Sequence, residues 1–247
     1  MDGCRILAAC MAIASVMLCG GLIAGQEAKP AEPASAKFYE ALIIMPIIPA
    51  RTADAIQADL IRADEDRQKA EQAVAACNAQ VIEAEGWIKL QKLDIDGLKL
   101  QIDAAKKEKR DADKAALETQ KKEHELVQDF LEKLKSVREA ALNLAKAQQV
   151  LASACRAAGQ AELDLAQKRG TWAALPAGDA GAVTAARSAF LAEETVSQAL
   201  KDLADKQSEM YDKQKKLNDR RIDLAKARTV LLNDGRLQAV QPPVVAE

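Results

Sequence analysis

A long heptad repeat constrains this chain more than any other feature of its sequence. Stepping alternately by four and three residues from Ile56 to Trp172 gives a seam that is almost entirely apolar. The polar exceptions are Arg67, Gln91, Lys109, Thr119, Glu123, Lys133 and Lys168. An apolar repeat of about 3.5 residues is typical of helices that pack side by side as a coiled coil. The sequence therefore predicts an all-α protein, an elongated coiled coil of long antiparallel helices.

The composition agrees with this fold class. Aromatic residues make up only 3% of the chain and charged residues 29%, which does not suit a compact globular core. The periodic segments contain no proline; the prolines are Pro30, Pro33, Pro46, Pro49, Pro176, Pro242 and Pro243. A formal net charge of -2, without a clustered basic face, gives no basis for nucleic-acid binding. We therefore expect no nucleic-acid partner.

The N-terminus has the pattern of an export signal. Arg5 supplies a positive charge, Ile6 to Leu18 is apolar, and small residues follow up to Gly25. Residues 1–25 are therefore predicted to be a signal peptide, which places the protein in the periplasm or outside the cell. The alternative is an uncleaved anchor in the inner membrane, because residues 6–25 approach the ~20 residues that span a bilayer.

Residues 26–51 are predicted to be a Pro/Ala linker that carries a short apolar arm. Its apolar residues are Phe38, Tyr39, Leu42, Ile43, Ile44, Ile47 and Ile48. Two prolines prevent a regular helix here. We favour an extended arm packed along the helices; the alternative is a peptide that docks onto a partner or a membrane surface.

Two helices are predicted after the arm. Thr52 is a suitable N-cap for the first, which covers residues 52–172. Residues 173–181 form the clearest turn, because Pro176 cannot continue a helix and Asp179 can cap the next one. The second helix covers residues 182–233, with a half-polar seam that includes Val196, Leu203, Met210, Leu217, Leu224 and Leu231. Residues 234–247 are predicted to be a disordered tail.

The second helix is too short to cover the first, so two arrangements remain open. One is a two-helix hairpin whose very long first helix pairs its uncovered half with another chain. The other is a three-helix antiparallel bundle in which the chain turns near Ala116. The region from Lys106 to Glu125 is the most charged part of the segment, but it contains no Gly, Pro or Asn. Its strong helix formers favour the continuous helix.

The two cysteines outside the signal segment discriminate between these arrangements. In a continuous helix Cys77 and Cys155 are on the order of 115 Å apart, too far for a disulfide. A turn near Ala116 would bring them level and make a Cys77–Cys155 bond feasible. Because we favour the continuous helix, we expect no bond between them within one chain.

The sequence contains no residue pattern typical of a catalytic or metal-binding site. Its single histidine, His124, cannot form a zinc site with two cysteines, and no catalytic triad is recognisable. We expect no metal, no cofactor and no enzymatic activity. The sequence instead predicts an exported structural or interaction protein of the bacterial cell envelope. It would act as a scaffold or adaptor through helix–helix contacts, with protein partners or with itself.

The helical repeats resemble those of known exported coiled coils. Leu142–Ala147 and Asp223–Ala227 are similar to the Leu/Ala repeats in the α-hairpins of efflux adaptors and outer-membrane efflux tunnels. In size and export the chain also resembles prefoldin-like periplasmic holdase chaperones. These resemblances imply two alternative functions, an efflux-associated α-hairpin protein or a holdase.

Overall fold

The computed structural model describes residues 43–176 and 178–233. Three long helices dominate these residues: α3 (Ala53–Lys107), α4 (Asp111–Ala173) and α5 (Ala182–Asn233). The described residues contain no β-strand, which confirms the predicted all-α class. The predicted signal peptide and C-terminal tail lie outside the described residues.

The predicted continuous helix over residues 52–172 is wrong, because the chain turns at Glu108–Arg110. Lys109 adopts a left-handed conformation with φ 57°, and the Arg110 N–H donates to the Ala105 carbonyl at 2.9 Å. This single left-handed residue ends α3 and reverses the chain. The turn falls within the charged region considered as a possible apex, several residues before Ala116.

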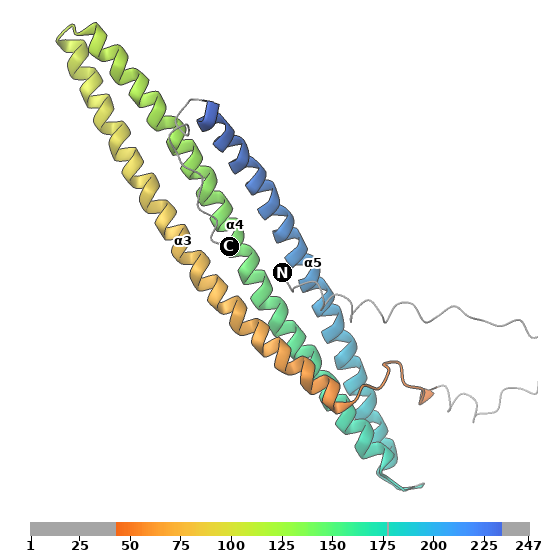
Figure 1. Cartoon of the computed structure of the whole chain (residues 1–247). Coiled ribbons are helices and arrows are strands. Elements are labelled where there is room, and N and C mark those ends of the chain that lie inside the picture. The colour runs from red at the N-terminus through yellow and green to blue at the C-terminus, as the bar shows by residue number, and fades with distance from the viewer. Residues whose placement is uncertain (1–42, 177, 234–247) are drawn as a thin grey trace, which may run out of the picture. The chain divides into compact units, whose positions relative to one another are not determined.

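The helix α4 lies between α3 and α5 and runs antiparallel to both (Figure 1). Two contacts fix the register of α3 against α4: Leu60 lies against Gly159, and Gln91 donates to the His124 carbonyl at 3.0 Å. Within residues 43–176 and 178–233, α3 and α5 make no contact with each other. The helical unit is therefore a layer of three helices rather than a cluster around one shared core.

The seam predicted for α3 is the face that α3 buries. All of the buried residues of α3 belong to it: Ile56, Leu60, Ala63, Ala70, Val81, Ala84, Ile88, Ile95 and Ala105. The predicted cap is also present, since the Ala55 N–H donates to Thr52 Oγ1 at 3.3 Å. The heptad analysis thus found the inner face of this helix correctly.

Because α4 has a neighbour on each side, it buries two strips. Gly159 faces α3, and a Cβ placed there would lie 2.9 Å from Leu60 Cδ2, so the missing side chain allows close approach. Ala145 and Ala152 precede Gly159 at heptad spacing and are also buried. On the other side, Leu165 packs with Ala192 and Val196 of α5.

Candidate interaction site

The apolar arm before α3 is held in place by a buried carboxylate. Glu193 of α5 is 6% exposed, and its Oε1 accepts hydrogen bonds from the backbone N–H groups of Ile47 and Ile48 at 2.9 and 3.1 Å. Arg169 of α4 pairs with the same oxygen and donates to the Ile48 carbonyl at 2.9 Å. The Ile48 side chain packs on the cluster formed by Leu165, Ala192 and Val196. One ion pair therefore joins the arm, α4 and α5.

A second ion pair extends this attachment to the start of α3. Arg51 donates to Glu162 of α4 at 2.7 Å and also pairs with Asp59 of α3. The hydrogen bond that Arg51 donates to Asp59, followed by the charge of Glu162, raises the pKa of the Arg51 guanidinium above its ordinary value. These contacts fix the path of the chain from Ile47 into α3.

The structure separates the residues that were predicted to dock onto a partner. Phe38, Tyr39 and Leu42 lie outside the described residues. Ile43 and Ile44 are exposed, and the side chain of Ile47 is 83% exposed although its backbone is held. Of the residues in this group that the structure describes, Ile48 is the one that turns inward and behaves as the packed arm predicted from sequence.

Sequence analysis did not single out Arg169 or Glu193. The signal was present in the seam of α5, because Glu193 lies three residues before the seam residue Val196. A charged residue at a seam position must find a partner, since burying an isolated carboxylate is costly.

The two cysteines are not bonded to each other. The turn at Lys109 places Arg156 opposite Asp64, with Arg156 Nε 3.1 Å from Asp64 Oδ1. Cys155 is therefore displaced from Cys77 by about 13 residues along α3, or on the order of 20 Å. The expectation of no bond within one chain rested on a continuous helix. In the structure the chain turns at Lys109, and because this turn does not bring Cys77 level with Cys155, the two thiols are again too far apart to bond.

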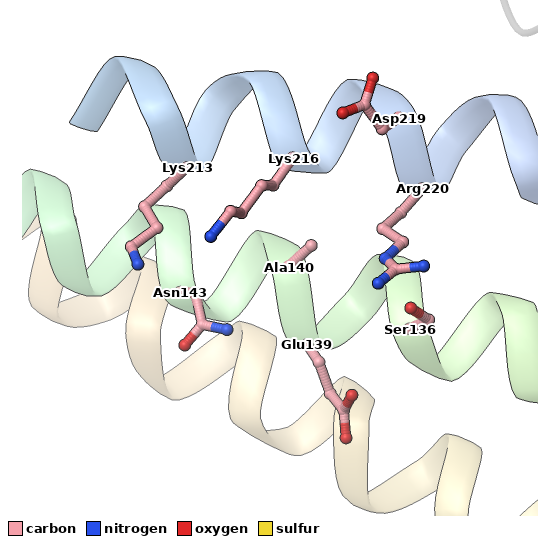
Figure 2. A pocket seen from close by; sticks show the side chains of 8 residues that line it. All are labelled: Ser136, Glu139, Ala140, Asn143, Lys213, Lys216, Asp219 and Arg220. Atoms are coloured by element: carbon pink, nitrogen blue, oxygen red, sulfur yellow. The ribbon is translucent and has the colours of Figure 1, made fainter. Parts of the chain in front are cut away.

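A shallow cleft of about 520 Å³ lies between α4 and α5. Lys213, Lys216 and Arg220 of α5 extend toward α4, whereas Glu139 points away from them (Figure 2). Glu139 is instead paired with Lys135 at 3.4 Å. The cleft is open and lined by charged side chains, and it does not enclose a reactive group.

Metal binding has no evident centre in the described part of the chain. His124 is hydrogen-bonded through Nδ1 to the amide nitrogen of Gln91 at 2.7 Å, in the contact between α4 and α3. No three His, Cys, Asp or Glu side chains gather there in a way that would hold a metal ion.

The outward face of α3 is the most unusual surface of the helical unit. Its large apolar side chains are exposed: Ile82 61%, Leu90 62%, Leu93 68% and Leu100 73%. Together with small residues between them they form a continuous line, which we call the outer stripe. The outer stripe comprises Ala75, Ala79, Ile82, Gly86, Leu90, Leu93, Gly97, Leu100 and Ala104.

Helix geometry places the outer stripe directly opposite the seam that α3 buries against α4. At about 100° per residue, the stripe falls within an arc of roughly 80°, centred about 175° from the buried seam. No charged residue enters that arc between positions 75 and 104. The helix α3 is thus apolar on two opposite faces, and α4 covers only one of them.

The outer stripe was not predicted from the sequence, because the predicted seam follows a single repeat of 3.5 residues. The stripe has a different period, since Ala79 and Leu90, Ile82 and Leu93, and Gly86 and Gly97 are each 11 residues apart. An 11-residue repeat drifts around an α-helix by about 20° per repeat, in the direction opposite to the drift of a heptad. This 11-residue spacing is the signal in the sequence that marks the stripe.

Comparison with known proteins gives no match, whether to family models, to curated sequences or to solved structures. None of the helices that the structure describes is apolar over enough of its length to cross a bilayer. The function must therefore be inferred from the surfaces described above.

Proposed function

We propose that this protein is an exported structural or interaction protein of the bacterial cell envelope, a scaffold or adaptor that works through helix–helix contacts. The observation that carries this proposal is the outer stripe of α3, an apolar helix face that nothing in the described chain covers. Contiguous apolar surface on a folded protein is a common feature of binding sites, because covering it is favourable.

The form of the stripe suits a helical partner. It is narrow and about 37 Å long from Ala79 to Ala104 at ~1.5 Å per residue. An apolar strip with small residues between large ones accepts the ridge of another helix. We propose that the packing between α3 and α4 and the packing across the stripe are both of coiled-coil type.

The proposed export of the protein is based on its N-terminal sequence pattern. Arg5, the apolar run from Ile6 to Leu18 and the small residues up to Gly25 support a signal peptide that directs the protein to the periplasm. The role as a scaffold requires no metal, cofactor or catalytic group.

We expect export to leave a new N-terminus near Gln26. The measurement is intact mass and N-terminal peptide sequencing of the protein taken from its native envelope. An intact Met1 in the membrane fraction would instead favour the anchor formed by residues 6–25. An intact Met1 in the cytoplasm would contradict export.

One alternative function has a specific observation in its favour. Ile43, Ile44 and Ile47 are exposed in addition to the outer stripe, and exposed apolar side chains are what a holdase offers to unfolded proteins. A scaffold captures a discrete partner, whereas a holdase captures many unrelated chains.

A photo-crosslinking amino acid at Leu93 tests the proposed role in living cells. We expect irradiation to give one or two discrete crosslinked species, because the outer stripe contacts a defined helix. The matched control is Lys92, the next residue on α3, whose side chain points about 100° away. A smear of products from Leu93 would favour the holdase, and equal yields from both positions would contradict a role for the stripe.

A further inference from the structure

We infer that the helix that covers the outer stripe is the α3 helix of a second copy of this chain, running antiparallel about a two-fold axis beside Gln91 and Lys92. This inference rests on the proposed function and names its partner. Four features of α3 carry it: the order of residues along the stripe, its two glycines, the charges beside it and its place in the helical layer.

The outer stripe reads almost the same in both directions. From the centre outward, Leu90 corresponds to Leu93, Gly86 to Gly97, Ile82 to Leu100 and Ala79 to Ala104, as the order along the chain shows. A two-fold interface must be self-complementary, because each residue meets its counterpart from the other copy. Antiparallel pairing about this centre puts leucines against leucines, glycines against glycines and alanines against alanines.

The two glycines have no evident role within the single chain. A Cβ added at Gly86 or Gly97 would meet nothing within 4 Å, in contrast to Gly159, where it would meet Leu60 at 2.9 Å. Glycine inside a helix costs about 1 kcal/mol relative to alanine. In the proposed pair Gly86 of one copy lies level with Gly97 of the other. At both of these contacts the two α3 helices can approach closely, as α4 and α3 do at Gly159.

On one flank of the stripe, the charges are complementary in the same register. Antiparallel helices bring the same flank of each copy together, and the nearest charged residues on one flank are Lys89 and Asp96. In this register Lys89 of each copy lies within about one helical turn of Asp96 of the other. Asp96 is exposed and pairs with Lys99 at 2.8 Å within the chain, so both cations can share it.

On the other flank the nearest charged residues are Glu83, which pairs with Arg138 of α4 at 3.0 Å, and Asp94. The two copies of Asp94 lie about 8 Å apart along the axis, so the charge complementarity is confined to one flank. Lys92 lies further round the helix toward α4.

The proposed pair continues the layer already formed within one chain. The outer stripe points away from α4, so a second α3 packs beside the first without meeting α4 or α5. Its footprint of roughly 37 Å by 10 Å buries on the order of 800 Å² in total, below the size of a standard stable interface. The pair is therefore a reversible dimer that responds to concentration.

The first experiment is sedimentation velocity over a range of concentrations, with the chain expressed from Met1 and purified in the form the cell makes. We expect the wild type to dimerise reversibly, and Gly86→Leu and Gly97→Leu to weaken the dimer by tenfold or more. Leucine adds apolar surface, so nonspecific hydrophobic association would become stronger in these variants. A stronger dimer would therefore overturn the inference. Gly170→Leu, at an open helical glycine of α4, is the matched control and should leave dimerisation unchanged.

A charge exchange tests the register. Lys89→Glu brings two carboxylates together at both symmetry-related sites beside the axis and is expected to weaken the dimer. Adding Asp96→Lys restores opposite charges and should recover at least part of the loss. If the double variant dimerises no better than Lys89→Glu alone, the proposed register is overturned.

Single cysteines test the direction of pairing in a background without native cysteines, in which Cys4, Cys10 and Cys19 are replaced by alanine and Cys77 and Cys155 by serine. Leu93→Cys lies near the axis and should form a disulfide-linked dimer on oxidation. Ile61→Cys is on the same outward face, but antiparallel pairing separates the two copies of position 61 by about 90 Å. Linkage at Ile61→Cys as efficient as at Leu93→Cys would indicate parallel pairing and overturn the inference.

The outcomes separate this inference from the proposed function. A wild type that stays monomeric at every concentration, while the crosslinker at Leu93 captures a different discrete protein, overturns the self-pairing and leaves the scaffold role standing. A monomeric wild type without crosslinks above the Lys92 control contradicts both.

Discussion

At the scale of single residues, Glu193 determines how the chain enters its first long helix. Its carboxylate occupies a seam position of α5 and is satisfied by two backbone N–H groups and by Arg169. Charge-assisted hydrogen bonds of this kind are about twice as strong as neutral ones. The arm from Ile47 to Arg51 is thereby attached by its backbone and not only by the packing of Ile48.

Replacing Arg169 by methionine should destabilise the protein. The change leaves the buried Glu193 carboxylate without its cation, and we expect a loss of about 1–3 kcal/mol in the free energy of unfolding. The measurement is urea unfolding followed by circular dichroism at one fixed protein concentration.

Arg187→Met on the exposed side of α5 is the matched control, expected to change stability by less than ~0.5 kcal/mol. The double variant Arg169→Met/Glu193→Leu should regain stability relative to Arg169→Met, because it removes the unpaired charge. A loss at Arg169→Met no larger than at Arg187→Met would contradict the role of the ion pair.

At the scale of secondary structure, the turn between α3 and α4 shows what sequence reasoning missed. The segment lacks Gly, Pro and Asn, so propensity alone favoured a continuous helix. Its charge order nevertheless marks a boundary, with Lys106 and Lys107 in the last turn of α3 and Asp111 and Asp113 in the first turn of α4. Cations stabilise helix C-termini and carboxylates stabilise N-termini, so this order suits one helix ending and another beginning.

Lys109→Gly should stabilise the protein. A left-handed conformation costs a residue with a side chain about 1–2 kcal/mol, and glycine removes that cost while adding some entropy to the unfolded chain. We expect a net gain of about 0.5–1 kcal/mol, measured by thermal unfolding.

The control for this prediction is Lys107→Gly, two residues earlier and still helical, which should lose about 0.5–1 kcal/mol. If both variants lose stability equally, Lys109 does not adopt the left-handed conformation in solution.

At the scale of the helical unit, the buried face of α3 was predictable and the number of helices was not. The buried face of α4 was predicted only in part, because Ala145, Ala152 and Gly159 each lie one position after the predicted seam. The heptad seam identified every buried residue of α3, from Ile56 to Ala105, because burial imposes its period on the sequence. That seam was followed without interruption through the turn, since a reversal at Lys109 does not change the spacing of apolar residues. The ion pair of Arg169 and Glu193 could not be predicted from the heptad repeat, because only the fold brings these two residues together.

The position of the turn also sets a distance. The arm is attached beside the start of α3, and the turn at Glu108–Arg110 lies at the other end of that helix (Figure 1). The 55 residues of α3 span about 82 Å at ~1.5 Å per residue. If the chain is anchored ahead of Ile47, the turn at Lys109 lies at the far end of α3 from the anchor. A partner that binds near Lys109 is then held about 80 Å from the anchor. Shortening α3 and α4 by matched heptads would change this reach in steps of about 10 Å while leaving both ends of the layer intact.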